Sequence, residues 1–133
     1  PLAPASGELL WRLVQRVAHG HGLAVLRSSH SMDVLAGGVS KRSLMHEIRR
    51  SLREDCKVLS IGDKGQWPGN DFELLDTPYS LSVDEVSADP ESCWNLAPPG
   101  HRGVQALLDY LSWAELRDDK FRLALPGFRS RAR

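Results

Sequence analysis

The chain has 133 residues, of which 41% are hydrophobic and 26% are charged, as in ordinary globular domains. Lys and Arg (17) balance Asp and Glu (17), so no net charge attracts nucleic acid or an anionic membrane. Apolar stretches last only a few residues and there are 2 cysteines, which excludes membrane-spanning and disulfide-rich classes. The length predicts one domain, and the lack of a visible leader predicts a cytoplasmic protein.

Helical and extended patterns alternate along the first half of the chain. Leu and Val recur at helical spacing after Ser6, a typical capping residue, and predict a helix over residues 8–19. Two short apolar runs, at 23–27 and 32–36, predict strands. A Gly-Gly break follows, and Ser40 then predicts the start of an amphipathic helix of about 14 residues.

The same alternation continues in the second half. Residues 57–61 are mostly apolar and predict a strand that ends abruptly at Gly62 and Asp63. After a loop rich in Gly and Pro, Asn70 and Asp71 form a strong capping pair for a short helix. Strands are predicted at 79–83 and 93–96, and a last helix at 104–111. Alternating strands and helices predict an α/β fold with a mainly parallel sheet.

The carboxyl-terminal residues 117–133 are basic. They contain six basic residues against Asp118 and Asp119. We expect a frayed, solvated terminus. Contact with an acidic partner or with RNA is the alternative.

Asp63 follows an apolar strand at the place where open parallel sheets bind ligands, beyond the carboxyl ends of their strands. A charged carboxylate there needs a partner, because an unpaired charge is costly in such surroundings. Mg²⁺ prefers one or two carboxylates with waters and phosphate oxygens, so Asp63 is a candidate metal ligand. A turn aspartate without function is the alternative.

Three further residues join Asp63 as candidates. A cation in the first turn of a helix opposes the helix dipole, so Lys41 makes sense there beside a bound anion such as phosphate. Asn70 and Asp71 return to the same edge of the sheet after the loop and can add a metal ligand or orient a water. Their alternative role is helix capping, and that of Lys41 is an ordinary surface lysine. Residues 37–43 lack the glycine that a P-loop places before its lysine, which excludes that motif.

Tryptophan is present at four positions. Trp11, Trp94 and Trp113 are expected in the core or at an interface. Trp67 lies in the loop rich in Gly and Pro, so we expect it to be exposed, where it could line a substrate pocket.

Taken together, these motifs resemble the haloacid dehalogenase-like (HAD) phosphatases, in their Cof-type and sucrose-phosphate-phosphatase-like branch. The resemblance covers residues 37–113 and rests on Gly-Val-Ser-Lys at 38–41, Gly-Asp at 62–63 and Asn-Asp before a Leu-rich helix at 70–75. It implies a partial Rossmann-like parallel sheet. It also implies that Lys41 is the catalytic lysine that balances the phosphate, that Asp63 and Asp71 bind Mg²⁺, and that Asn70 supports the metal.

The resemblance also implies a domain organisation. Residues 1–36 would be the end of an α/β cap, residues 37–116 the carboxyl-terminal half of the core, and residues 117–133 a basic tail. Two features depart from the family pattern. Six residues separate Gly-Asp from Asn-Asp where the family usually has two, and the nucleophile motif Asp-x-Asp-x-Thr/Val is absent from the 133 residues.

We therefore expect a fragment of a Mg²⁺-dependent phosphohydrolase acting on a phosphorylated small molecule, such as a sugar phosphate, through an aspartyl-phosphate. Without the nucleophile, this polypeptide is expected to be inactive alone. The strand at 57–61 would then be an exposed edge, which predicts pairing with the missing amino-terminal half or with a second copy. A non-catalytic module that binds phosphate or a partner is the alternative.

Overall fold

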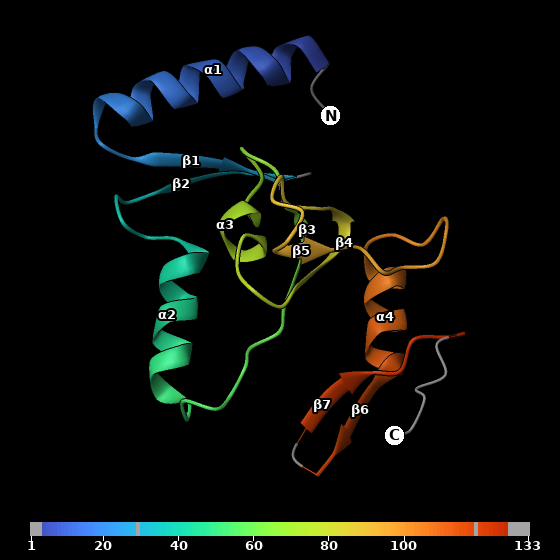
Figure 1. Ribbon diagram of the computed structural model, residues 1–133. Helices are drawn as coiled ribbons and strands as arrows, with labels where there is room; N and C mark the ends of the chain where they lie inside the picture. Colours follow the sequence, from blue (N-terminus) through green and yellow to red (C-terminus); the bar gives the residue numbers. More distant parts are fainter. Residues whose placement is uncertain (1–3, 29, 119, 128–133) are drawn as a thin grey trace. The chain divides into compact units, whose positions relative to one another are not determined.

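The computed structural model describes residues 4–28, 30–118 and 120–127 (Figure 1). The chain divides into two compact units, Pro1–Asn95 and Leu96–Arg133. As predicted, the structure is mixed α/β, and its first unit contains a small parallel sheet of three strands. Within the described part of the chain, no helix is both long and apolar enough to cross a bilayer.

The first unit begins with a helix packed on a hairpin. Helix α1 (Pro4–Gly20) is followed by β1 (Ala24–Arg27), which pairs antiparallel with β2 (Met32–Leu35). A small apolar core joins helix and hairpin through Trp11, Val14, Ala18, Val25 and Met32. The helix starts earlier than predicted and contains Ser6, so the predicted cap at Ser6 is wrong. Proline is tolerated in a first turn because the N–H it lacks would have no helical partner there.

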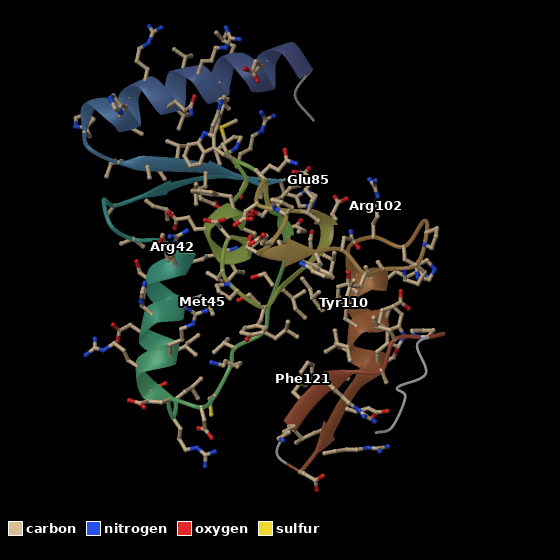
Figure 2. All side chains as sticks on the ribbon, viewed as in Figure 1. Arg42, Met45, Glu85, Arg102, Tyr110 and Phe121 are labelled. Atoms are coloured by element: carbon tan, nitrogen blue, oxygen red, sulfur yellow. The ribbon has the colours of Figure 1, made fainter. Side chains whose placement is uncertain are left out.

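Helix α2 (Lys41–Ser51) has the predicted cap. The backbone N–H of Ser43 donates to Oγ of Ser40 at 3.3 Å. Met45 is the buried residue of this helix, and its side chain is labelled in Figure 2. The helix has 11 residues, fewer than predicted, because the chain turns into an extended conformation at Leu52.

The parallel sheet has the order β3-β4-β5, with β3 at Ser60–Lys64, β4 at Ser80–Glu85 and β5 at Cys93–Trp94. The predicted strand at 57–61 is displaced, because pairing with β4 starts only at Ser60. The strand also continues through Gly62 and Asp63 to a register shift before Lys64, so the predicted end at Gly-Asp is wrong. Helix α3 (Phe72–Leu75) packs against this sheet and buries Leu75 completely.

The second unit contains α4 (Val104–Trp113) and a hairpin of β6 (Ala114–Arg117) and β7 (Lys120–Leu123). The expected frayed terminus is wrong for these residues. Opposite charges on the two strands stabilise the hairpin, since Arg122 lies 2.6 Å from Glu115 in the register. The end of the basic segment, residues 128–133, lies outside the described residues.

The tryptophans only partly follow expectation. Trp11 is buried and Trp67 is 60% exposed, as predicted. Trp94 is 58% exposed and therefore not a core residue. Its strand has two residues, and alternation along a strand buries Cys93 and leaves Trp94 outside.

Candidate functional site

The first turn of α2 and the start of α3 bring Lys41 and Asp71 together. The Nζ of Lys41 donates to Oδ1 of Asp71. The Asp71 side chain is 8% exposed, whereas that of Lys41 is 42% exposed. A second ion pair joins the first turn of α2 to the end of α3, since Arg42 Nη2 lies 2.9 Å from Oδ2 of Asp76 (Figure 2 labels Arg42). The Lys41 ammonium is thus held by Asp71, while part of the Lys41 side chain remains open to solvent.

Asp63 meets the same carboxylate from the sheet. Its backbone N–H donates to Oδ2 of Asp71 at 2.9 Å. This approach requires glycine before it, because a Cβ at Gly62 would lie 2.6 Å from that oxygen. Lys41 and Asp63, predicted on separate grounds, therefore both contact Asp71. The Gly-Asp pair has a physical reason: the glycine makes room and the next N–H binds the carboxylate.

The capping role that the sequence left open for Asp71 is wrong for its side chain. Asp71 occupies the N-cap position of α3, but its side chain makes no capping hydrogen bond. Both carboxylate oxygens are used elsewhere, on Lys41 and on the N–H of Asp63. Only the backbone carbonyl of Asp71 serves the helix, accepting from Leu75 N–H at 2.8 Å.

The six-residue loop does not separate the two motifs in space. Asp71 N–H donates to the carbonyl of Lys64 at 3.2 Å, so the loop returns to the strand where it left. Inside the loop, Gly69 N–H donates to the carbonyl of Gln66 at 2.6 Å. A Cβ at Gly69 would lie 2.5 Å from the carbonyl of Lys64, so this closure requires glycine. The extra residues bulge outward and leave Asp63 and Asp71 adjacent.

The two carboxyl groups have opposite pKa shifts. Burial raises the pKa of Asp63, and the neighbouring carboxyl of Asp71 raises it further by hydrogen bonding and repulsion. Burial also works to raise the pKa of Asp71, but the ammonium of Lys41 and the N–H of Asp63 outweigh it and lower that pKa below 3.8. The surroundings therefore favour the charged form of Asp71 and the protonated form of Asp63.

Asn70 and Glu73 lie next to this cluster in sequence. The backbone N–H of Asn70 donates to the carbonyl of Arg27 at 3.1 Å, which ties it to β1. Among the described residues, its side-chain Oδ1 is buried without a hydrogen-bond partner. Glu73 Oε2 is buried and unpartnered in the same way. No sequence pattern singled out Glu73, because the helix dipole alone explains an acidic residue in a first helical turn.

Replacing Asp71 with asparagine is expected to lower the pKa of Asp63. The substitution removes the neighbouring negative charge, while the raising effect of burial remains. NMR titration of the Asp63 carboxyl carbon measures this shift. Asp76→Asn, at an exposed carboxylate paired with Arg42, is the control and should leave the titration unchanged. An unchanged Asp63 pKa in Asp71→Asn would contradict the described proximity.

The same shifts set the sign of the pH dependence of stability. The pKa of Asp71 is lower in the folded state, so its contribution is present above pH 3.8 and is lost as the pH falls. The pKa of Asp63 is raised, so its contribution is present at low pH and is lost as the pH rises through the folded-state pKa. A cation that neutralises both carboxylates would offset the stability that is lost when Asp63 ionises.

Comparison of the chain with protein-family models, with curated proteins and with solved structures finds no significant match.

Proposed function

We propose that Lys41, Asp63 and Asp71 form the magnesium- and phosphate-binding half of a HAD-type phosphohydrolase site. One observation carries the proposal: a single buried carboxylate, Asp71, contacts both the Lys41 ammonium and the Asp63 N–H. The two carboxyl groups can share a cation, and the partly exposed ammonium can reach an anion beside them. The substrate class is a phosphorylated small molecule, with a sugar phosphate as the first candidate.

The donor set fits Mg²⁺. Carboxylate oxygens are its preferred protein ligands, and one or two of them suffice when waters and phosphate oxygens complete the shell. Among residues 4–28, 30–118 and 120–127, no group of three or more His, Cys, Asp or Glu side chains could hold a metal ion. The proposed site therefore uses two carboxylates only, with waters and phosphate oxygens as the other ligands. Asp63 and Asp71 would hold the ion, and the unpartnered Oδ1 of Asn70 supplies a further acceptor for its waters. When bound, the ion would polarise a phosphoryl oxygen.

Each of the three site residues has a separate role in this proposal. Asp71 holds the Lys41 ammonium, so that it faces a phosphate from the amino end of α2. The N–H of Asp63 binds the Asp71 carboxylate, and the Asp63 carboxylate would be the second ligand of the cation. The nucleophilic aspartate must come from outside these 133 residues, because they contain no Asp-x-Asp-x-Thr/Val.

Calorimetric titration with MgCl₂, and then with inorganic phosphate in the presence of Mg²⁺, tests the proposal. The wild-type chain should bind Mg²⁺. Asp63→Asn should weaken the binding at least tenfold, or by about 1.4 kcal/mol, because it removes one of the two carboxylate ligands. Lys41→Met should retain Mg²⁺ and lose phosphate. The controls are Asp55→Asn and Lys57→Met, at exposed positions away from the site. Equal Mg²⁺ affinity in wild type and Asp63→Asn would contradict the metal site.

The alternative is a non-catalytic phosphate-binding module, and the absent nucleophile motif favours it. Both functions share the binding site and differ in turnover. With a generic aryl phosphate and Mg²⁺, we expect no hydrolysis above background by this polypeptide, because the covalent step lacks its carboxylate. Hydrolysis that Asp63→Asn abolishes would contradict this expectation and establish a complete enzyme.

The edge of the sheet is the proposed place for a partner. In the described part of the chain, β3 has a strand neighbour on one side only, although Asp71 already binds the Asp63 N–H and the Lys64 carbonyl at the end of that strand. A polypeptide carrying the nucleophile strand would pair there and bring its aspartate next to Asp63. A second copy of this chain is the alternative occupant.

A further inference from the structure

A polar pocket lies beside the 64–69 loop. It has a volume of about 370 Å³, within the range of small-molecule sites. Its lining comes from the end of β1, the loop and the end of β4, and includes Arg27, Ser28, Lys64, Gln66, Trp67 and Glu85. Figure 2 labels Glu85, at the end of β4. None of these residues belongs to the Lys41–Asp63–Asp71 cluster.

Trp67 gives this pocket an aromatic wall. Its indole is 60% exposed, so part of the ring is open to a ligand in the pocket. The ring is held in place by Phe72, at 4.8 Å between centroids and in an edge-to-face arrangement. An exposed, fixed aromatic surface suits a ligand that presents C–H groups to the ring.

The loop that carries Trp67 is bound to β1 and packed against the end of β4. Its backbone is tied to β1, because Arg27 N–H donates to the carbonyl of Pro68 at 2.8 Å and Asn70 N–H donates to that of Arg27 at 3.1 Å. At its base, a Cβ on Gly65 would lie 2.6 Å from the backbone of Val86, so the loop lies against the end of β4. Such a preformed site loses little entropy on binding.

The charged side chains that line the pocket already form ion pairs. Lys64 Nζ lies 2.5 Å from Glu85 and 3.7 Å from Asp84. Arg27 lies 3.6 Å from Glu8 and its guanidinium is 5.9 Å from the Trp11 ring centroid. Both cationic side chains of the lining therefore already have a carboxylate partner. The Gln66 amide, the Arg27 guanidinium and the Glu85 carboxylate still offer donors and acceptors around the aromatic wall.

We propose that this pocket binds an uncharged saccharide ring, which stacks on Trp67 and hydrogen-bonds to Gln66. A sugar ring combines C–H faces with hydroxyl groups that both donate and accept, and these match the aromatic wall and the mixed polar lining. The pocket is a binding site separate from the proposed phosphate site. Its occupancy does not depend on Mg²⁺ or on Asp63.

Saturation-transfer NMR on the full chain, with methyl α-glucopyranoside and sucrose as probes, tests the proposal. We expect transfer to the sugar ring protons with a Kd of about 1 mM, corresponding to roughly 4 kcal/mol. Trp67→Ala should abolish the transfer and Trp67→Phe should keep part of it. Trp94→Ala, at a tryptophan of similar exposure (58%), is the matched control and should bind normally.

A second pair of variants distinguishes this pocket from a neighbouring hollow. Trp67 also borders a hollow of about 470 Å³ against α1 that includes Gln15. Gln66→Ala should weaken sugar binding about tenfold, the loss of one good hydrogen bond, and Gln15→Ala should not. Absence of saturable transfer at about 100 mM sugar in the folded wild-type chain would overturn the proposal. Weakening by Gln15→Ala instead of Gln66→Ala would overturn it as well, whereas Asp63→Asn should leave sugar binding unchanged.

Discussion

Leu75→Ala is expected to lower the free energy of unfolding of the first unit by about 2–5 kcal/mol, the range for a fully buried leucine. Leu75 is completely buried and ends α3, which packs against β3 and β4. Removing its side chain leaves a cavity under the turn that carries Asn70 and Asp71. The effect should therefore extend to the candidate site.

Native-state hydrogen exchange of the amides of β4 measures this change within the first unit alone. Leu44→Ala, in α2, replaces a leucine that is 60% exposed and should cost less than about 1 kcal/mol. A loss in Leu75→Ala no larger than in Leu44→Ala would mean that α3 does not pack on the sheet as described.

Gly69→Ala is expected to cost about 2–3 kcal/mol, as for a forced insertion into a packed site. The new Cβ would lie 2.5 Å from the carbonyl of Lys64 and 2.6 Å from that of Gln66. Both are backbone atoms, so the loop itself must move. We expect faster exchange of the Asn70 amide, which bonds to β1.

Gly7→Ala is the matched control for the glycine variant. Gly7 lies inside α1 and a Cβ there would meet nothing within 4 Å. Alanine is the better helix former by about 1 kcal/mol, so this variant should be slightly stabilised. Chemical denaturation of both variants gives the comparison, and equal stability of the two would contradict the tight closure of the loop.

Local signals in the sequence predicted most helices and strands. Ser40 capped its helix as expected, because a serine hydroxyl is a strong acceptor for the first free N–H groups. The start of β3 was missed because apolarity alone does not say where a partner strand begins; pairing with β4 decides it. The β6–β7 hairpin was missed because its basic residues suggested a solvated tail, while Glu115 on the opposite strand pairs with Arg122.

The sequence likewise predicted part of the candidate site and missed part of it. The sequence placed Lys41 at a helix start and Asp63 near a strand end, and both contact Asp71 in the structure. The sequence could not decide between capping and another task for the Asp71 side chain, because the competing donors are 30 and 8 residues away. The sequence also did not show that Asp63 and Asp71 lie close together, because this depends on how the loop folds back on Lys64 at Gly69.

Paramagnetic broadening by Mn²⁺, an ion that shares the preference of Mg²⁺ for oxygen ligands, tests the proposed metal site most directly. In a two-dimensional NMR spectrum of the full chain, the amide signals of Gly62, Asp63 and Asp71 should disappear first, and excess Mg²⁺ should restore them. Broadening that begins elsewhere, for example around Asp84 and Glu85, and that persists in Asp63→Asn would contradict a metal at the shared carboxylates.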